Sequence, residues 1–366
     1  MSEDDEREEE AGEGEPAEIP SPRENSLLLG HEAAEATLLQ FSAADRLPHG
    51  LLIAGPHGIG KATLAFRFAR FLLAQVGEPP GGSLFASAAP TTLALPPEHP
   101  VFRRIASGGH ADLLVVERGI NPKNKRVRTE IVVDDVRTIA GFLRLTPAEG
   151  GWRIVIIDTA DEMNRNAANA VLKILEEPPR RALLILISDN PGRLLPTIRS
   201  RCRRVTLRPL PETVVARLIE RYRPDLKPSD RDALVALAPG SIGHALELAE
   251  QGGIALHRQL LELLAALPNL DGLKLHSFAE KAGRWGNDDG FRAVAELLPA
   301  TLARAITEAA GGGEGNLAQK LRGHGLDRWV EVWEKINHLF ALADAVNLDR
   351  KQVVLNAFFA LEEAAR

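Results

Sequence analysis

The stretch that decides the fold is 51-LLIAGPHGIGKATLAFRFARFLLAQ-75. Its first four residues, Leu51–Ala54, are apolar and are typical of a buried strand. A glycine-rich turn follows from Gly55 to Gly60, and then a helix whose apolar side begins with Leu64 and Phe68. Strand, G-x-x-x-x-G-K and helix, in this order, form the context in which a phosphate-binding P-loop occurs.

The residues of this turn predict a degenerate nucleotide site. Three glycines allow the backbone N–H groups to face inward as an anion site, with a helix N-terminus behind them: Gly55, Gly58 and Gly60. Lys61 is expected to reach the terminal phosphates. The next position is Ala62, where Mg²⁺ binding calls for Ser or Thr. Thr63 comes one residue late, about 100° further round the helix.

The composition is that of a soluble protein of two or three domains in 366 residues. No apolar run approaches the roughly 18 residues that span a bilayer. The acidic N-terminus has no apolar segment of the signal-peptide type, so we expect a cytoplasmic protein. The single cysteine, Cys202, excludes an intrachain disulfide and is expected to be a small buried side chain. The histidines are scattered, and we expect no metal site.

The charge is unevenly distributed. Residues 1–24 hold eleven acidic side chains against two arginines, a local balance of −9, which leaves about +3 for the rest because the whole chain carries −6. Glu, Gly and Pro dominate this segment, which predicts a disordered acidic tail. A mildly basic remainder excludes a strongly basic nucleic-acid binder, so any DNA contact would come from a local patch.

Strands and helices alternate after the P-loop helix. Apolar strands are predicted at 113–116, 152–157 and 183–187, and a helix at 164–177 stops at a Pro-Pro pair. This alternation predicts a doubly wound parallel sheet. Between these elements we expect a loop at 77–100, a basic loop followed by a helix at 119–145, and an arginine-rich loop-helix segment at 190–205.

Only helical patterns follow residue 207. Residues 210–250 predict a small helical bundle broken by prolines, and further helices are expected at 256–267, 289–309, 325–346 and 351–365. The basic loop near Lys125 and Arg126 could contact phosphate backbone, although its charge alone favours a solvated loop.

Asp158 ends the predicted strand 152–158 and is placed like a Walker B carboxylate that holds Mg²⁺. Given Ala62, a strand-end hydrogen-bond acceptor without metal is an equal alternative. In motor ATPases an acidic residue follows this aspartate to activate water, and here Thr159 stands there. Asp161 and Glu162 come later, and for them we expect a helix-capping or exposed role.

The segment 196-PTIRSRC-202 is unusually rich in arginine. A guanidinium is always charged and binds phosphate oxygens bidentately, so Arg201 could act as an arginine finger supplied to a neighbouring subunit. On the residues alone, a solvated basic edge formed by Arg199, Arg201, Arg203 and Arg204 ranks first.

Three motifs together resemble the clamp-loader branch of the AAA+ proteins: HGLL leading into GPHGIGK, NAANAVLKILEEPP, and NPGRLLPTIRSRC. The resemblance covers residues 30 to about 250, and the L-E-E-P-P and S-R-C segments are specific to this branch. It implies an α/β AAA+ core, a small helical lid and an all-helical oligomerisation collar. The expected parts are a disordered tail at 1–24, the P-loop core at 25–206, the lid at 207–253 and the collar at 254–366.

Matching positions carry over the family's functional residues. The P-loop glycines and Lys61 fall on the phosphate loop, and Asp158 falls on the Walker B aspartate. Residues 188–190 fall at the end of the sensor 1 strand. Arg201 is the arginine of the S-R-C motif, which in this family acts on ATP bound by the neighbouring subunit. Residues 240–246 resemble the start of the sensor 2 helix, with Gly243 in place of its arginine.

The departures from the family pattern agree with one another. Ala62 lacks the Mg²⁺ hydroxyl, Thr159 the catalytic acid and Gly243 the sensor arginine, whereas Arg201 is kept. This combination implies a subunit that does not hydrolyse ATP but assists a neighbour. No cofactor is required, weak ATP or ADP binding stays open, and zinc is not expected because residues 76–112 hold no cysteine.

The leading hypothesis is therefore a component of a hetero-pentameric clamp loader in a DNA polymerase holoenzyme. Its implied partners are ATPase subunits of gamma or tau type, a delta subunit, a sliding clamp and primer-template DNA, with no membrane. The competing hypothesis is an ATP-hydrolysing AAA+ motor or remodelling factor in which Thr63, Asp161 or Glu162 replaces the missing groups. A small-molecule P-loop kinase explains neither the C-terminal helices nor the S-R-C motif.

Overall fold

The structure is a computed structural model that describes residues 19–43, 47–75, 90–120, 125–283, 288–313, 315–323, 325–346 and 348–366. The chain divides into two compact units. The first unit holds Met1–Asp225 and Gly240–Gly243, and the second holds Leu226–Pro239 and His244–Arg366. The finer division into tail, core, lid and collar stays a prediction.

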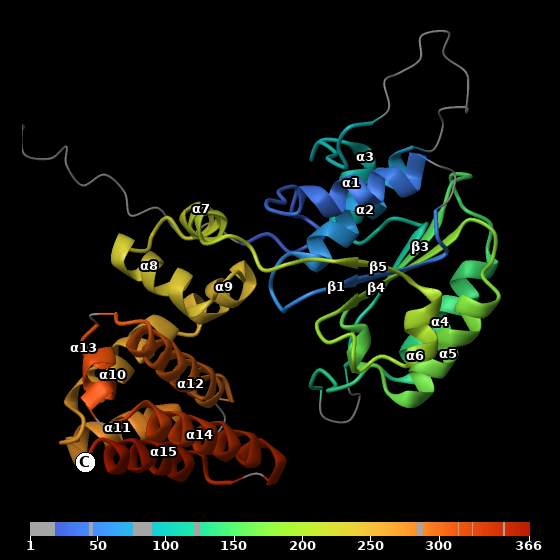
Figure 1. Cartoon of the computed structure of the whole chain (residues 1–366). Helices are drawn as coiled ribbons and strands as arrows, with labels where there is room; N and C mark the ends of the chain where they lie inside the picture. Colours follow the sequence, from blue (N-terminus) through green and yellow to red (C-terminus); the bar gives the residue numbers. More distant parts are fainter. Residues whose placement is uncertain are drawn as a thin grey trace, which may run out of the picture. The chain divides into compact units, whose positions relative to one another are not determined.

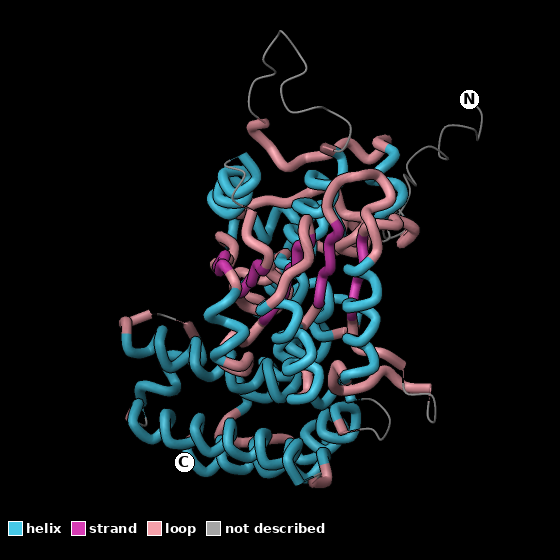
Figure 2. Tube along the Cα trace, turned by 90° about the vertical axis from the view of Figure 1, so that its right-hand side faces the viewer, coloured by secondary structure: helices cyan, strands magenta, loops and turns pink. Residues whose placement is uncertain are grey.

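A parallel sheet of five strands forms the centre of the first unit, in the order β2-β3-β4-β1-β5 (Figures 1 and 2). Its strands are β1 Gly50–Ala54, β2 Leu113–Val116, β3 Arg153–Ile157, β4 Ala182–Ser188 and β5 Arg203–Thr206. The predicted parallel sheet is thus confirmed. Because all strands run in one direction, their carboxyl ends meet at one edge, where ligands bind in such sheets.

Helices cover both faces of this sheet (Figure 1). One face carries α1 Glu32–Ala43, α2 Lys61–Ala74 and α3 Pro100–Ala106, and the other carries α4 Val133–Arg144, α5 Arg165–Glu176 and α6 Pro196–Arg201. The strands are apolar on both sides for this reason: Ile53 packs with α2, and its neighbour Leu52 packs with α5. A 3₁₀ turn, η1 Ala160–Glu162, follows β3, and α7 Glu212–Tyr222 completes the unit.

The helix after the P-loop is buried on nearly all sides. Arg70 is 1% exposed, and its guanidinium donates to the carbonyls of Arg23 (3.1 Å) and Asn25 (2.8 Å) while it stacks on the Phe102 ring. Residues 23–25 thus cover α2. The remainder of the expected acidic tail, residues 1–18, lies outside the described residues.

Strand β5 corrects the sequence interpretation, which placed residues 190–205 in a loop-helix segment. The strand was not predicted because it contains Arg203 and Arg204, and charged residues are rare in a buried strand. Here β5 lies at the edge of the sheet, and only Val205 is buried, so the arginines remain exposed. The guanidinium of Arg203 lies 5.6 Å from the centre of the Phe41 ring.

The second unit is helical in its described part. It contains α8 Pro228–Leu237, most of α9 Ile242–Glu250, α10 Gly253–Ala266, α11 Gly272–Ala282, α12 Asp288–Ala310, α13 Asn316–Gly323, α14 Leu326–Val346 and α15 Arg350–Ala364. Four of these correspond to the helices expected after residue 254, whereas α11 and α13 were not predicted. Edge-to-face aromatic pairs join Phe278 of α11 to Phe358 of α15 and Phe291 of α12 to Phe340 of α14.

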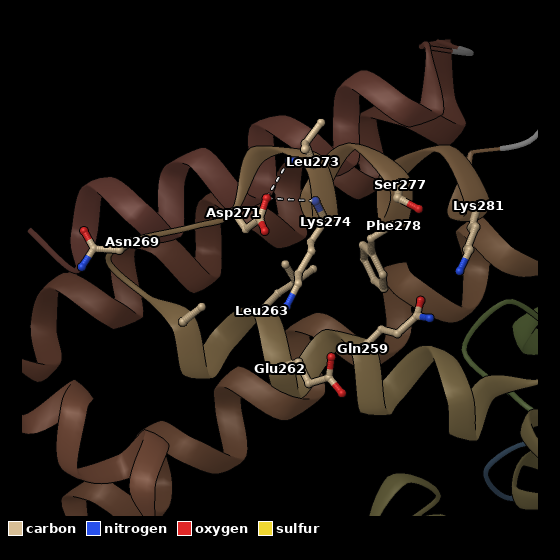
Figure 3. Close-up of a pocket in the computed structure, with 11 residues that line it drawn as sticks. Gln259, Glu262, Leu263, Asn269, Asp271, Leu273, Lys274, Ser277, Phe278 and Lys281 are labelled. Atoms are coloured by element: carbon tan, nitrogen blue, oxygen red, sulfur yellow. Dashed lines mark hydrogen bonds between the residues drawn. The ribbon is translucent and has the colours of Figure 1, made fainter.

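Helices α10 and α11 border a hollow of about 450 Å³ (Figure 3). Leu263 and Phe278 line it, and charged side chains such as Glu262 and Lys281 stand at its walls. Leu273, at the start of α11, is 86% exposed. Among the described residues, no helix has the length and apolar character needed to cross a membrane.

Candidate functional site

The P-loop joins β1 to α2 at the carboxyl edge of the sheet, as the sequence predicts. Gly60 has φ +102°, a left-handed conformation that glycine adopts without strain, and it ends the loop as the N-cap of α2. The ring of the buried His31 donates from Nε2 to the Ile59 carbonyl at 2.7 Å. His31 therefore anchors the P-loop, although no sequence motif indicated this role.

Lys61 is buried and its ammonium group is engaged within the chain. Its side chain is 4% exposed, and Nζ lies 2.6 Å from Asp189 Oδ1. Nζ also donates to the carbonyl of Pro56, five residues earlier. In a P-loop this ammonium is the group that contacts the terminal phosphates, so here a carboxylate holds the cation that a phosphate would use.

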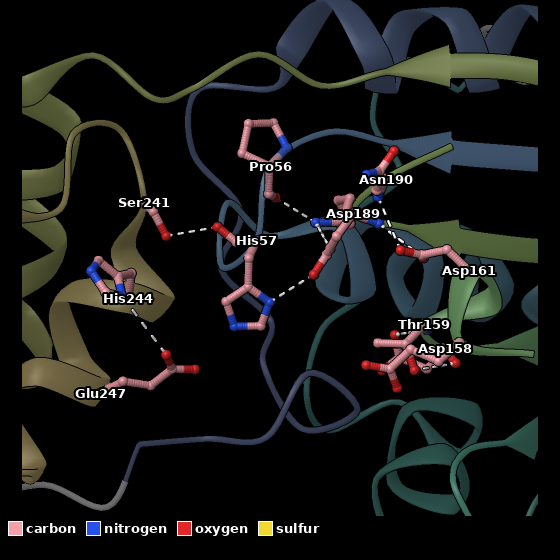
Figure 4. Close-up of polar contacts among 12 residues, drawn as sticks. Pro56, His57, Asp158, Thr159, Asp161, Asp189, Asn190, Ser241, His244 and Glu247 are labelled. Carbon is pink, nitrogen blue, oxygen red and sulfur yellow. Dashed lines mark hydrogen bonds and ion pairs between the residues drawn. The ribbon is translucent and has the colours of Figure 1, made fainter. Parts of the chain in front are cut away.

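Asp189 follows β4 and binds two residues of the P-loop at once (Figure 4). Oδ1 faces Lys61, and Oδ2 lies 2.9 Å from His57 Nδ1. Burial alone would raise the pKa of this carboxyl, but hydrogen bonds and charges from His57 and Lys61 outweigh burial and lower the pKa. The group is therefore ionised at neutral pH.

The segment Gly240–Gly243 lies directly on the P-loop. The Ser241 hydroxyl donates to the His57 carbonyl at 2.8 Å (Figure 4). The Gly243 N–H donates to the Gly58 carbonyl at 2.8 Å. A Cβ atom at Gly243 would lie 2.6 Å from Gly58 Cα. The predicted loss of an arginine at this position thus coincides with a backbone approach that no side chain allows.

Asp158 directly follows β3, at the strand end where it was predicted, and is partly buried. Its Oδ1 accepts from the backbone N–H of Thr159 at 2.9 Å, and Thr159 has the left-handed φ of +50°. Burial raises the pKa of Asp158, and the negative charges of Glu117 and Asp189 act in the same direction. In this structure Asp158 therefore acts as a hydrogen-bond acceptor at the end of β3.

The residues of the loop do not fit Mg²⁺. Ala62 offers no hydroxyl, and the side chain of Thr63 is buried within α2. Within the described ranges no cluster of three histidine, cysteine or acidic side chains could hold a metal ion. No step of the chemistry is therefore assigned to a metal on this chain.

Asp161 and Glu162 have other roles than the capping or exposed ones predicted for them. Asp161 accepts from the backbone N–H groups of Asp189 (3.2 Å) and Asn190 (3.0 Å), and thereby fixes the loop after β4. Glu162 pairs with Arg118 at 3.0 Å. The sequence did not indicate these partners, because they lie on separate loops that meet only at the sheet edge.

Arg201 ends α6 and is partly exposed. Its Nη2 lies 2.9 Å from Glu176 Oε1, the first glutamate of the L-E-E-P-P segment, and its Nη1 donates to the Thr197 carbonyl at 3.1 Å. The side chain is 36% exposed. Cys202, the next residue, is buried, as predicted, and burial raises the pKa of its thiol to about 12.

The structure brings together part of the predicted site. The P-loop, Lys61 and Gly243 meet at the carboxyl edge of the sheet, and the pKa of Asp158 responds to Lys61 and Asp189. Arg201 binds residues of α5 and α6 instead. Asp189 was placed by sequence at the sensor 1 position, but its contact with Lys61 was not foreseen.

A doubly wound parallel sheet with a P-loop after β1 and an aspartate after β3 defines the fold of a P-loop protein. Residues 30–211 match the family model described as DNA polymerase III, delta subunit. Slightly less than half of the chain lies within this match.

Individual relatives agree with this family. The chain is 36% identical over 229 residues to DNA polymerase III subunit delta' of Pseudomonas aeruginosa, covering 62% of this chain and 64% of the relative. It is 31% identical over 245 residues to subunit delta' of Bacillus subtilis, covering 66% and 65%. The alignments thus span slightly less than two thirds of these relatives.

The solved structures that are similar to this chain include a DNA polymerase III gamma subunit-related protein from Thermotoga maritima. It is 20% identical, with a TM-score of 0.42, and the match covers 90% of this chain and 99% of that one. The RuvB Holliday junction branch migration motor of the same organism has a TM-score of 0.39 at 16% identity, over 86% of this chain and 90% of that one.

Proposed function

We propose that this chain is the delta' component of a DNA polymerase III clamp loader, which does not hydrolyse ATP itself and offers Arg201 to the ATP site of a neighbouring subunit. The observation that carries this proposal is a contrast between two cations. The P-loop lysine is buried against the chain's own carboxylate, whereas Arg201 is partly exposed at the end of a helix. The relatives named delta' subunits support the same reading.

In this role the phosphoryl-transfer chemistry takes place on the neighbour. A guanidinium stabilises the charge that develops on the transferred phosphoryl group, and an arginine finger is worth about 10³–10⁵ in turnover at the site it serves. Glu176 holds the Arg201 guanidinium at the surface, so the side chain enters an interface with a defined starting geometry.

The proposed partners are ATPase subunits of gamma or tau type and a delta subunit in a hetero-pentamer. The assembly would place a sliding clamp on primer-template DNA as part of a DNA-directed DNA polymerase holoenzyme in the cytoplasm. Relatives of this chain include DNA polymerase III subunit tau/gamma of Haemophilus influenzae, at 28% identity over 310 residues. That likeness supports assembly from related subunits.

The competing motor hypothesis is not favoured, because the groups it needs have other contacts. Thr63 is buried, Asp161 binds the backbone after β4, and Glu162 pairs with Arg118. For any of them to act on water or Mg²⁺, a contact in the first unit would first have to break.

Turnover of the assembled complex tests the role of Arg201. We expect Arg201→Ala to leave the chain folded and assembled but to silence the neighbouring ATP site, so that ATPase turnover of the complex falls by that site's share. Arg199→Ala, on the same helix, is the matched control and should leave turnover unchanged. Normal turnover in a fully assembled Arg201→Ala complex would refute the finger assignment.

A further inference from the structure

In the P-loop, the lysine that would contact a phosphate is bound to a carboxylate of the same chain. Lys61 can donate three hydrogen bonds through its ammonium group. One is directed to Asp189 Oδ1 at 2.6 Å and another to the Pro56 carbonyl. The strongest donor that a P-loop offers to a phosphate is therefore already bound to a carboxylate oxygen.

The carboxylate of Asp189 reaches the two ends of the loop. Oδ2 lies 2.9 Å from His57 Nδ1, so the group links a residue near the start of the turn to the lysine at its end. A phosphate oxygen pair would make the same kind of two-point, charge-assisted contact. Asp189 thus contacts Lys61 and His57 of the loop in the way that an anionic ligand would.

The position of Asp189 is fixed by its neighbours. The Asp189 backbone N–H donates to Asp161 Oδ1 at 3.2 Å, and the Asn190 N–H donates to Asp161 Oδ2 at 3.0 Å (Figure 4). Asp161 itself follows β3, so two adjacent strand ends hold the carboxylate over the loop. The contact with Lys61 is consequently a built feature of the sheet edge.

A second contact closes the loop from another side. Ser241 and Gly243 hydrogen-bond to the carbonyls of His57 and Gly58, and the Gly243 and Gly58 backbones touch. The turn is thereby held in one conformation while its lysine is bound. Both contacts lie within the first unit.

We propose that Asp189 is an internal anionic ligand of this P-loop, and that it lowers the loop's affinity for polyphosphates by occupying Lys61. A nucleoside triphosphate or an inorganic triphosphate binds only when its phosphate replaces the carboxylate. This deepens the proposed function, on which it rests only in taking the P-loop as a site without turnover. Asp189 thus determines the affinity of the loop for polyphosphates, because its charge both occupies the lysine and repels an incoming anion.

Calorimetric binding of ATP and of inorganic triphosphate to the full chain tests this assignment. Asp189→Ala should bind both about tenfold or more tightly than the unchanged chain, because a charge-assisted contact is released and a like charge is removed. The double variant Asp189→Ala with Lys61→Ala should lose this gain. Asp134→Ala, which removes a carboxylate from an exposed position on α4, should bind like the unchanged chain.

The outcomes separate cleanly. The assignment is overturned if Asp189→Ala gains less than about threefold, if the gain persists without Lys61, or if it occurs with ATP but not with inorganic triphosphate. Asp189→Asn keeps the shape of the side chain and serves where the alanine variant does not fold, with the same direction expected. None of these results depends on turnover of the complex, so failure here leaves the role of Arg201 standing, and the reverse also holds.

Discussion

The pKa of Asp158 depends on its burial and on the charged residues around it. A Walker B aspartate faces a metal-bound nucleotide, but here burial has the largest effect on its pKa, Glu117 and Asp189 raise the pKa further, and Lys61 lowers it. The sequence placed the carboxylate at the end of the correct strand. The charges around it belong to Glu117, Asp189 and Lys61, which lie on three separate segments of the chain, so they could not be predicted from the strand itself.

The pKa of Asp158 leads to a prediction for stability. Burial raises this pKa above the unfolded value of 3.8, so the folded state binds the proton more tightly and the ionised carboxylate costs stability. This cost is present in full above the folded pKa and disappears below the unfolded one. Asp158→Asn should therefore raise the melting temperature at neutral pH, and the gain should shrink as the pH falls toward 3.8.

Thermal unfolding at several pH values measures this effect. Asp134→Asn, at an exposed position, serves as the control and should show no comparable gain. A gain for Asp158→Asn that is independent of pH, or a loss of stability at neutral pH, would contradict the electrostatic explanation.

At the scale of elements, the segment Gly240–Gly243 is the clearest case of a structure that explains a sequence departure. Gly243 was identified as a missing sensor arginine. Its backbone N–H donates to Gly58, and a Cβ would come within 2.6 Å of Gly58 Cα. Glycine is therefore required at position 243 because its backbone packs against the P-loop. The same glycine also lacks the positive charge of the sensor arginine.

Replacement of this glycine should destabilise the protein. Gly243→Ala forces a methyl group against backbone, and overpacking of this kind costs about 1–3 kcal/mol. Gly141→Ala is a matched control inside α4, because a Cβ there meets nothing within 4 Å. Alanine is favoured over glycine in a helix by about 0.8–1 kcal/mol, so the control should be neutral or stabilising. Urea unfolding compares the two, and equal effects would refute the packing argument.

Strand β5 marks the limit of pattern reading at this scale. Its two arginines and short length resemble a loop, and only the partner strand β1 makes it a strand. Buried strands such as β3 and β4 were predictable because long apolar runs bounded by turns have few other uses in a soluble protein.

For the whole molecule, the prediction concerns catalysis by the chain alone. With Ala62 and Thr159 in place of the metal and water groups, and Lys61 bound to Asp189, steady-state ATP hydrolysis with Mg²⁺ should not exceed that of Lys61→Ala. Clear turnover that Lys61→Ala abolishes would instead favour the motor hypothesis. This measurement needs no partner subunit and distinguishes the two functional classes directly.

The sequence by itself determined the class of fold, the place of the P-loop, the three missing groups and the retained arginine. These follow from local patterns: apolar periodicity, glycine spacing and residue identity at motif positions. Only the tertiary structure shows which group of the chain contacts Lys61 in place of a nucleotide phosphate. Asp189 reaches Lys61 because parallel strands bring the loops after β1 and β4 to one edge of the sheet, and Gly243 reaches Gly58 because residues 240–243 pack on the P-loop. Contacts between such loops depend on strand order, which no local pattern contains.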